Sequence, residues 1–584
     1  MNNSILPSDL TASPRPNDFL RPAKPASRHG PLSRSAGRAR SAAVVWALPA
    51  LVLLGLIWRA PWLMQAERTL DADEAVTGLM AMDIVQGARP VYYYGQGYLG
   101  TIEPFTAAGL FAVLGSGPEA LRLAPLLLFV LSLCFQFVVV RHWFGCRAAW
   151  WSLLPWCAAP ATVALWTVKA RGGFTAVLLF GMMLTWTYQQ GVAASPRRRT
   201  RWLLLAGLVL GFGWWTNAMV IFYALPLAVL VLRRIRAAER CMAGGQTAET
   251  DDEGLGNGMP IRYVALVAAG LTVGLIPAVL YRLAPGGMPP RQLFDPDPSL
   301  WVSGTRVLFG EALPALLDTA GSALGVAALL GAAVLALAML VAGFRAARAP
   351  GHTPLADAPA ETPEGTIYLA LLWIAVPLVA VLSNQVTDVH GFRYLLPLFS
   401  ALSLSFGVTW AYLAGHSRGY RAVLILASVV WLVHSGLSLN SRRGEEVRTL
   451  AAGSIARALS AVDASVVTAP YWDSYRLSFL TGRRLAAVPF TGPIRDLAGL
   501  RAWQDQTPFC ALLAEDNGTV STALTQALTP QERVRMIPTA GRQLVVVEPA
   551  DETGWEQRKA ELLALLRDTS EVDSARSPDW AALQ

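Results

Sequence analysis

The residues best suited to chemistry stand close together near the N-terminal end of the chain. Asp71, Asp73 and Glu74 put three carboxylates within four positions, and Glu103 follows in the next apolar segment. Apolar stretches flank this region on both sides. Charged side chains within a membrane are energetically unfavourable, so acidic residues in such a place indicate a function. A carboxylate here can accept a proton from an incoming hydroxyl or amine and hold that nucleophile in line with a leaving group. The alternative is a solvated helix N-cap whose acidic neighbours favour the helix dipole.

A loop rich in tyrosine and glycine joins the acidic cluster to Glu103. It reads VYYYGQGYLGT over residues 91–101. Aromatic faces suit a sugar ring, and glycine lets the backbone approach a ligand closely. An ordinary aromatic belt at the membrane interface is the alternative. We predict a substrate-binding set made up of Asp71, Tyr94, Gln96, Tyr98 and Glu103.

Three basic residues fall where our expected topology has the outer face of the membrane. Lys169 and Arg171 lie in WTVKARGGF, and Arg393 lies in DVHGFRYLLP. The positive-inside rule disfavours cations there, so we predict a bound anionic group such as a phosphate, with bidentate contacts from Arg393. His390 is a candidate donor to the same group or a general acid. The alternatives are cations that snorkel to lipid headgroups and a solvated loop histidine.

The composition indicates a membrane protein. The 584 residues are 54% hydrophobic and 15% charged, whereas soluble domains are roughly 25% charged. The net charge of +8 comes from arginines in short loops between apolar runs, which the positive-inside rule explains without nucleic acid as a partner. The five cysteines are scattered and predict no disulfide. No zinc-type spacing is present, so we expect no metal.

Length and hydropathy divide the chain into three parts. Residues 1–41 predict a disordered basic cytoplasmic tail. Residues 42–439 predict a transmembrane domain of roughly eleven spans, each near the ~20 residues a bilayer needs, with an extracytoplasmic loop over 61–119. The expected spans are 43–58, 121–140, 148–166, 174–188, 202–215, 218–232, 263–281, 323–342, 367–382, 394–413 and 422–438. Residues 440–584 predict a small extracytoplasmic α/β domain.

Within these parts, several local elements are expected. A helix over 74–86 with Asp73 as its N-cap, an interfacial helix over 104–114 and a helix break at Thr216-Asn217 are predicted. In the C-terminal part, strands are expected at 464–468, 485–488, 510–514, 535–537 and 543–547, helices at 445–459 and 492–504, and a loose tail from about Ser570.

Three motifs carry a family resemblance over about residues 43–438. They are the D-E-A run at Asp73–Ala75, the GQGYLG run at Gly95–Gly100 and RYLLP at Arg393–Pro397. They resemble the GT-C superfamily of membrane glycosyltransferases, whose members include protein O-mannosyltransferases, aminoarabinose transferases of lipid A and proteins of the glycosyltransferase family 39 type. The resemblance implies transfer of a sugar from a polyprenyl-phosphate carrier to an acceptor outside the membrane. It also implies Asp73 as the base and Arg393 as the contact to the lipid phosphate. The Lys-Pro-Pro motif of some relatives is replaced here by YLGTIEPF.

The sequence thus predicts an inverting glycosyltransferase of the bacterial inner membrane. Asp73 and Glu74 form its catalytic pair, and Arg393, Lys169, Arg171 and His390 bind the donor phosphate. The expected partners are a polyprenyl-phosphate-linked sugar, membrane lipids and a lipid, glycan or protein acceptor, with no cofactor. A divalent cation held by Asp71 and Asp73 is the alternative to metal-free chemistry. A transporter or flippase of lipid-linked sugars is the alternative function, followed by a sensor or scaffold.

Overall fold

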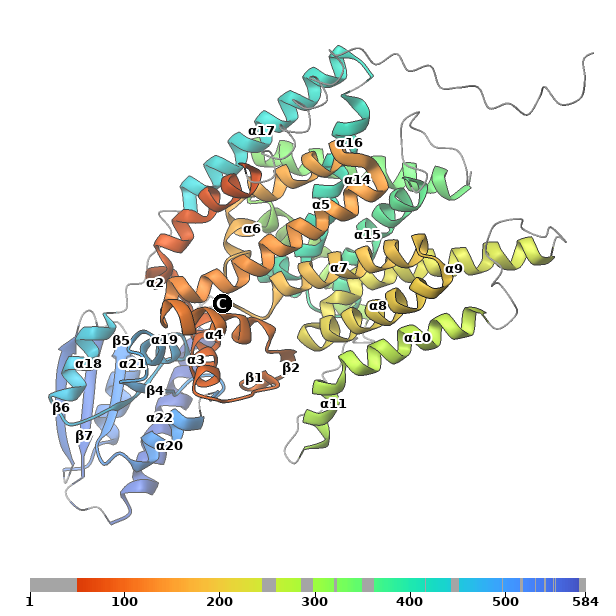
Figure 1. The fold of residues 1–584 in the computed structure, drawn as a ribbon. Helices are drawn as coiled ribbons and strands as arrows, with labels where there is room; N and C mark the ends of the chain where they lie inside the picture. The colour runs from red at the N-terminus through yellow and green to blue at the C-terminus, as the bar shows by residue number, and fades with distance from the viewer. Residues whose placement is uncertain are drawn as a thin grey trace, which may run out of the picture. The chain divides into compact units, whose positions relative to one another are not determined.

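The computed structural model describes most of the chain from Ala50 onward. The described residues are 50–243, 259–284, 298–319, 323–348, 362–414, 416–442, 451–495, 497–514, 518–530, 532–539, 542–549, 551 and 553–576. The expected tail over 1–41 and the start of the first expected span lie outside them. From Leu51 onward the chain forms one unit, so its helices and its sheet are described together (Figure 1).

Helices make up the first three quarters of this unit. They are a segment over Ala50–Met64, then α2 (Ala66–Thr69), α3 (Ala72–Val85), α4 (Ile102–Leu114), α5 (Pro118–Cys157), α6 (Ala161–Trp166), α7 (Phe174–Ala193), α8 (Pro196–Thr216), η2 (Ala218–Val220), α9 (Ile221–Ala243), α10 (Met259–Gly274), α11 (Ile276–Leu283), α12 (Pro298–Val307), η3 (Leu308–Ala312), α13 (Leu313–Leu316), α14 (Ala323–Arg348), α15 (Thr362–Leu382), η4 (Val389–Leu395), α16 (Leu396–Leu413) and α17 (Arg418–Arg442). A short hairpin of β1 (Tyr92–Tyr93) and β2 (Gln96–Gly100) joins α3 to α4.

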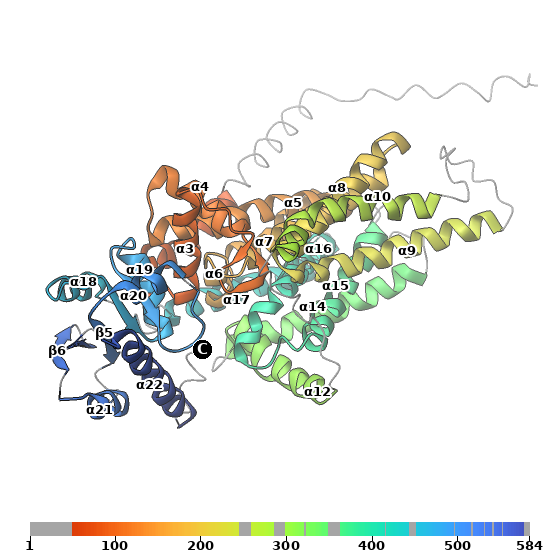
Figure 2. The same ribbon diagram turned by 90° about the horizontal axis from the view of Figure 1, so that it is seen from below.

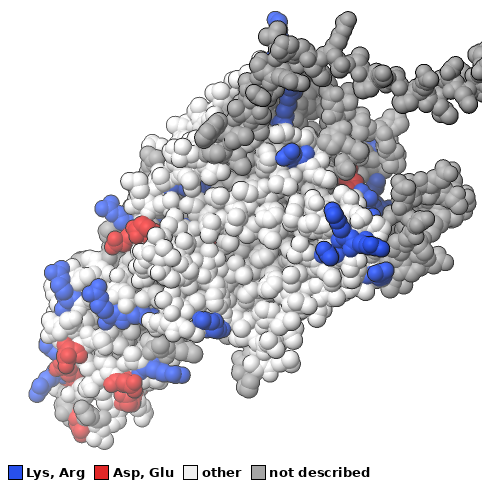
Figure 3. Space-filling view, viewed as in Figure 1, with Lys and Arg blue, Asp and Glu red and all other residues white. Residues whose placement is uncertain are grey.

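Length and composition make this a polytopic helical membrane protein. Six described helices are long and apolar enough to cross a membrane, or seven if the bent pair α10–α11 counts as one span. One face of the molecule has a wide uncharged belt, with charged side chains gathered toward its ends (Figure 3). The count of roughly eleven spans, which rested on the ~20-residue criterion, stays a prediction.

The structure corrects the expected end of the first span and the expected span over 148–166. The first helix continues past Trp58 to Met64, because the buried Arg59 donates hydrogen bonds to the Thr167 hydroxyl and the Trp156 carbonyl and so does not end the helix. The expected span over 148–166 is two helices, since α5 ends at Cys157 and α6 begins only after Pro160, which has no N–H for a helix interior. Gly145 interrupts α5 with φ of +84°, within the loop predicted to separate two spans.

Helices α8 and α10 lie side by side with glycines at their contact (Figure 2). A Cβ built on Gly207 would lie 2.1 Å from the Val267 carbonyl oxygen, and one on Gly270 would lie 2.1 Å from the Leu204 carbonyl oxygen. Small residues let membrane helices approach this closely. The predicted break at Asn217 is confirmed, because its amide accepts from the Met219 N–H and donates to the Gly172 carbonyl.

The start of α3 corrects the predicted N-cap, which is Asp71 and not Asp73. The Glu74 N–H donates to Asp71 Oδ1 at 2.8 Å, and Glu74 Oε2 accepts from the Asp71 N–H at 3.4 Å. This capping box satisfies two backbone donors that a helix end leaves free. Because Asp73 and Glu74 then lie inside the first turn, about 100° apart around the axis, their carboxylates point in different directions.

The C-terminal part contains a five-stranded sheet, and each of the five predicted strands has a counterpart in it. The strands lie in the order β4-β3-β5-β7-β6. Strands β3, β4 and β5 are parallel, whereas β7 is antiparallel to β5 and β6. Their bounds, with those of the helices, are α18 (Ala452–Ser460), β3 (Val466–Ala469), α19 (Tyr471–Leu480), β4 (Ala486–Pro489), α20 (Leu497–Asp505), β5 (Phe509–Ala514), α21 (Gly518–Ala527), β6 (Arg533–Thr539), β7 (Arg542–Glu548) and α22 (Trp555–Arg576).

Two apolar clusters cover the two faces of this sheet. Along β3, Val467 and Ala469 pack with α18 and α19, whereas Val466 packs on the other face with α22, as the alternation of a strand requires. The expected tail from Ser570 is wrong as far as Arg576, because α22 is anchored by buried leucines and continues to that residue. That residues 440–584 form a separate extracytoplasmic domain stays a prediction.

The predicted helix over 492–504 also begins later than expected. Gly492 has φ of +71°, and Pro493 lacks an N–H, so the chain turns before α20 starts at Leu497. The expected helix over 445–459 is α18 from Ala452 onward, and residues 443–450 lie outside the described part. This late start of α20 leaves Arg495 in a loop.

Candidate active site

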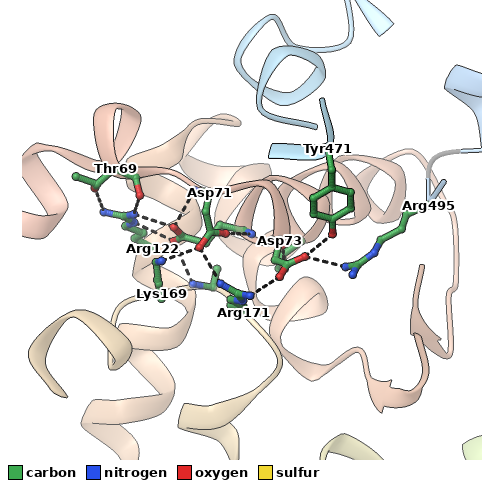
Figure 4. Close-up of polar contacts among 11 residues, drawn as sticks. Thr69, Asp71, Asp73, Arg122, Lys169, Arg171, Tyr471 and Arg495 are labelled. Carbon is green, nitrogen blue, oxygen red and sulfur yellow. Dashed lines mark hydrogen bonds and ion pairs between the residues drawn. The ribbon is translucent and has the colours of Figure 1, made fainter. Parts of the chain in front are cut away.

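Asp73 is the centre of a group of polar contacts (Figure 4). Its Oδ2 pairs with the Arg171 guanidinium at 2.7 Å. Its Oδ1 accepts from the Tyr471 hydroxyl at 2.6 Å and from Arg495 at 3.0 Å. Three donors from distant parts of the chain therefore fix the orientation of one carboxylate.

Arg171 and Lys169 reach α3 from the short loop between α6 and α7. Gly172 and Gly173 have φ of +70° and +69°, a left-handed conformation that glycine adopts at no steric cost. This turn directs Lys169 Nζ to Asp71 Oδ2 at 2.6 Å, and Arg171 bridges the carboxylates of Asp71 and Asp73. Burial alone would raise the pKa of Asp71, but the two cations outweigh it and the pKa lies below its ordinary value.

Glu74 turns away from this group and forms a buried ion pair with Arg122. Arg122 donates to both carboxylate oxygens, at 3.0 and 2.8 Å, and both side chains are 0% exposed. The other Arg122 hydrogen bonds go to the Trp62 carbonyl and to the carbonyl and hydroxyl of Thr69. The pair thus fastens α5 to the segment before α3, and every charge in it has a partner.

Glu103 is also buried, but neutral donors hold it. The Tyr93 hydroxyl and the Gly173 N–H donate to its Oε2 at 2.9 and 3.2 Å, and its Oε1 has no hydrogen-bond partner in the structure. Burial raises the pKa of Glu103 from 4.5 to about 7, against the opposing effect of these hydrogen bonds. This carboxyl group therefore changes charge near neutral pH.

A cavity of about 360 Å³ lies in front of Asp73. Five of the predicted site residues line it, namely Asp73, Gln96, Tyr98, Arg171 and Arg393. Arg393 stacks over the Tyr394 ring, with 5.2 Å from its Cζ to the ring centroid, and its buried Nε has no hydrogen-bond partner among the residues that the structure describes. The structure thus brings the predicted carboxylate and the predicted phosphate-binding arginine to one cavity, although 320 positions separate them in the sequence.

The remaining predicted residues lie outside the described lining of this cavity. Asp71, Glu74 and Lys169 hold the start of α3, as described above. The Tyr94 hydroxyl donates to Asp83, and His390, on η4, has a buried Nε2 without a hydrogen-bond partner. Together with Glu103, these six predicted residues are absent from the described lining.

Sequence reasoning missed three polar residues at the site, which are Arg122, Arg282 and Arg495. It raised Tyr471, within the aromatic and charged run 471–476, as a possible contact to sugar or acceptor, but did not connect it with Asp73. Arg282 and Arg495 line the cavity. A signal for Tyr471 and Arg495 was present, because each follows a predicted strand of a parallel pair, β3 or β4, and functional side chains gather beyond the carboxyl ends of such strands. Arg122 and Arg282 lie inside apolar helices, where a lone arginine marks a partner or a ligand.

The predicted alternative is a divalent cation bound by Asp71 and Asp73, but the Arg171 guanidinium already occupies the position between these two carboxylates. Arg171 sits between the two carboxylates, 3.2 Å from Asp71 and 2.7 Å from Asp73. Among the described residues, no group of three or more His, Cys, Asp or Glu side chains is arranged to hold a metal ion. The positive charge that a metal would supply between these carboxylates is supplied by a guanidinium.

The arrangement of helices is similar to that of two solved ArnT structures, so the predicted resemblance is confirmed at the level of the fold. The structure is similar to ArnT from Cupriavidus metallidurans in the apo state, with a TM-score of 0.55, 14% identity and coverage of 88% of this chain and 99% of ArnT. For ArnT from the same organism bound to undecaprenyl phosphate, the TM-score is 0.54 at 16% identity, and the match covers 85% of this chain and 98% of ArnT.

A third solved structure is less similar, with a TM-score below 0.5. The oligosaccharyltransferase AglB from Archaeoglobus fulgidus gives a TM-score of 0.44 at 12% identity, over 81% of this chain and 69% of AglB. No model of a known protein family matches the sequence, and no curated protein matches it. At such low identity, the ArnT structures define the fold, and the chemistry has to be argued from the site.

Proposed function

We propose that the chain is an inverting glycosyltransferase of the bacterial inner membrane. It would move a sugar from a polyprenyl-phosphate donor to an acceptor on the extracytoplasmic side. The observation that carries the proposal is the single cavity lined by Asp73 and by Arg171, Arg282 and Arg393. The ArnT fold supports it, because one ArnT structure has undecaprenyl phosphate bound.

The arginines in the cavity suit the donor phosphate. Arg393 offers a buried Nε that has no hydrogen-bond partner within the described part of the chain, and Arg282 lines the same cavity. Guanidinium groups match phosphate oxygens bidentately and stabilise the charge that develops on a departing phosphate. His390 stays in the proposal as a second donor, because its Nε2 is also buried without a partner.

Asp73 suits the acceptor. In the proposed step, the acceptor oxygen forms a bond to the anomeric carbon while the bond from that carbon to the phosphate oxygen breaks. The electron pair of the broken bond leaves with the polyprenyl phosphate, and the acceptor proton passes to the Asp73 carboxylate. A single displacement of this kind inverts the anomeric carbon.

The other residues have supporting roles in this proposal. Gln96 and Tyr98 line the cavity beside Asp73, where an amide and an aromatic face can bind the sugar. Glu74 and Asp71 are positioning residues, because their ion pairs with Arg122 and Lys169 hold the first turn of α3. This refines the predicted catalytic pair, since Glu74 would act through Asp73 and not on the substrate.

The test is a transfer assay on the purified chain with a panel of polyprenyl-phosphate sugars. Asp73→Asn should lower turnover by about a hundredfold or more, the range for loss of a general base. Asp83→Asn is the matched control: it lies on the same helix, pairs with Arg483, is absent from the described cavity lining and should keep near wild-type turnover. Unchanged turnover in Asp73→Asn would remove Asp73 from the mechanism.

Two further measurements separate the alternatives. Turnover that survives a chelator supports metal-free chemistry, whereas its loss and recovery with Mg²⁺ or Mn²⁺ would support the cation alternative. Movement of a lipid-linked sugar across proteoliposomes without any transfer would contradict the enzyme proposal and favour the flippase.

A further inference from the structure

We propose that the C-terminal sheet region completes the active site, and that its Tyr471 and Arg495 are positioning residues that leave Asp73 Oδ2 to receive the acceptor proton. This inference rests on the proposed function. It deepens that proposal by assigning the reacting atom and by making the region after residue 450 part of the catalytic unit.

The first support is the docking of α19 along α3, which both ribbon views show (Figures 1 and 2). Phe479 of α19 packs so closely on Gly78 of α3 that a Cβ there would lie 2.4 Å from the ring. The same ring stacks on Phe111 of α4, with 6.2 Å between centroids. Arg483 pairs with Asp83 at 2.8 Å beyond this apolar contact, so the two helices are held together along their length.

The second support is the place of the two residues in the sheet. Tyr471 comes directly after Pro470 at the end of β3, and Arg495 follows the end of the neighbouring parallel strand β4. Functional groups gather at this edge of parallel sheets because adjacent strands release their loops there. The crossover helix α19 between these two strands is the helix that packs on α3.

The third support is that the loop carrying Arg495 is itself held. The Tyr475 hydroxyl accepts from the Arg495 N–H at 2.6 Å and donates to the Pro493 carbonyl at 3.0 Å. The Tyr471 N–H donates to the Thr491 hydroxyl at 3.0 Å. These contacts fix the backbone at Arg495, so its guanidinium reaches Asp73 from a rigid base.

The fourth support is a count of acceptor sites on Asp73. An ionised carboxylate has about four lone-pair sites, two on each oxygen. Oδ1 accepts from both Tyr471 and Arg495, and Oδ2 accepts from Arg171. Burial and the nearby carboxylate raise the pKa of Tyr471, so its hydroxyl stays protonated and donates. The remaining site is on Oδ2, and an acceptor hydroxyl would bind there beside Arg171.

The experiment compares two contacts that hold the same region. Arg495→Gln and Tyr471→Phe each remove one donor from Asp73. Arg483→Gln removes the ion pair with Asp83, away from the described cavity lining, and serves as the matched control. All four proteins, wild type included, and the conservative variant Arg495→Lys are assayed as full chains in detergent, and thermal unfolding checks that each is folded.

The expected kinetic result separates positioning from docking. Arg495→Gln and Tyr471→Phe should each lower kcat by about tenfold or more, the effect of one hydrogen bond to a charged group, while KM for the donor stays nearly unchanged. Arg495→Lys should recover part of kcat, and Arg483→Gln should keep it. Near wild-type kcat in both Arg495→Gln and Tyr471→Phe would overturn the proposal, and so would an equal loss in Arg483→Gln.

A second readout does not depend on sugar transfer. A water-soluble carbodiimide with an amine nucleophile modifies the protonated form of a carboxyl group, and mass spectrometry of the Asp73 peptide measures the extent. Arg495→Gln and Tyr471→Phe should each raise labelling of Asp73, whereas Arg483→Gln should not. If wild type transfers no sugar, the proposed function fails, and the labelling still decides whether the C-terminal region holds Asp73. Equal labelling in all four proteins would overturn that contact.

Discussion

Two neighbouring carboxylates on α3 have contrasting surroundings. Glu74 is buried with Arg122, and both of its oxygens are paired. Asp73 faces a cavity that is lined by Arg495 and by three more arginines, Arg171, Arg282 and Arg393. The two residues are adjacent in sequence and of the same chemical type, yet one fastens helices together and the other faces the space where a substrate would bind.

The two carboxylates differ in how completely their charge is compensated and in whether they can still bind a ligand. A buried charge is tolerated when a counter-charge and hydrogen bonds satisfy it completely, and such a group has no capacity left for a ligand. Three described contacts leave one of the roughly four lone-pair sites of the Asp73 carboxylate unused. Among the described residues, the buried Nε of Arg393 has no hydrogen-bond partner. Incomplete pairing beside a cavity therefore distinguishes the groups that we assign to the reaction from those that hold the fold.

The largest expected effect comes from exchanging the two carboxylates for amides. Glu74→Gln leaves Arg122 as a buried charge without a counter-charge, which should lower the free energy of unfolding by about 3–5 kcal/mol. Asp73→Asn should lower that free energy less, because Arg171 keeps its ion pair with Asp71, and should lower turnover by about a hundredfold or more. Thermal unfolding and turnover of both variants test this, and a Glu74→Gln protein as stable as wild type would break the comparison.

A third buried carboxylate sharpens the comparison through pH. Glu103 lacks the paired cation of Glu74, and burial raises its pKa to about 7 from 4.5. The folded state then binds more protons than the unfolded state between these values, so stability should fall as pH rises from about 4.5 to 7, by up to about 3 kcal/mol. Glu103→Gln should remove that dependence, and unfolding curves from pH 4 to 8 measure it. Parallel curves for both proteins would contradict the prediction.

The next prediction concerns Arg393 and the binding of the donor phosphate. Arg393→Gln should weaken binding of undecaprenyl phosphate by about tenfold to a hundredfold, the value of a hydrogen bond to a charged group, without lowering the unfolding temperature. Arg306→Gln, on the exposed side of α12, is the matched control and should bind like wild type. Equal affinities of the two variants would show that the phosphate binds elsewhere.

The smallest effect tests how the tyrosine-glycine loop meets the C-terminal region. Gly95 has φ of +71°, and a Cβ there would lie 3.1 Å from Arg495 Cγ. Gly95→Ala should cost about 1–2 kcal/mol of stability through its left-handed backbone and also lower turnover by displacing Arg495. The Cβ of Gly109→Ala on α4 would meet no atom within 4 Å, so this variant should keep turnover and should not lose stability, because alanine favours a helix interior over glycine. A neutral Gly95→Ala would show that the loop and Arg495 adjust freely.

Local patterns in the sequence were sufficient to predict much of the fold. Apolar runs of strand length predicted all five strands, and the polar pair at Thr216-Asn217 predicted the break between α8 and α9. Distant partners set the outcome of one failed prediction, and a local alternative set the outcome of another. Arg59 did not end the first helix because Thr167 and Trp156 accept its hydrogen bonds, and Asp73 is not the N-cap because Glu74 completes a capping box with Asp71.

For the site, residue type and spacing determined which carboxylates and arginines were candidates, since charges are rare and costly in an apolar chain. Only the tertiary structure decided how they divide, because burial and pairing depend on contacts across hundreds of positions. It assigned Glu74 to Arg122, brought Asp73 and Arg393 to one cavity, and added Tyr471 and Arg495 from the sheet. Sequence order carries no direct record of such contacts, because they form only when helices and strands pack together.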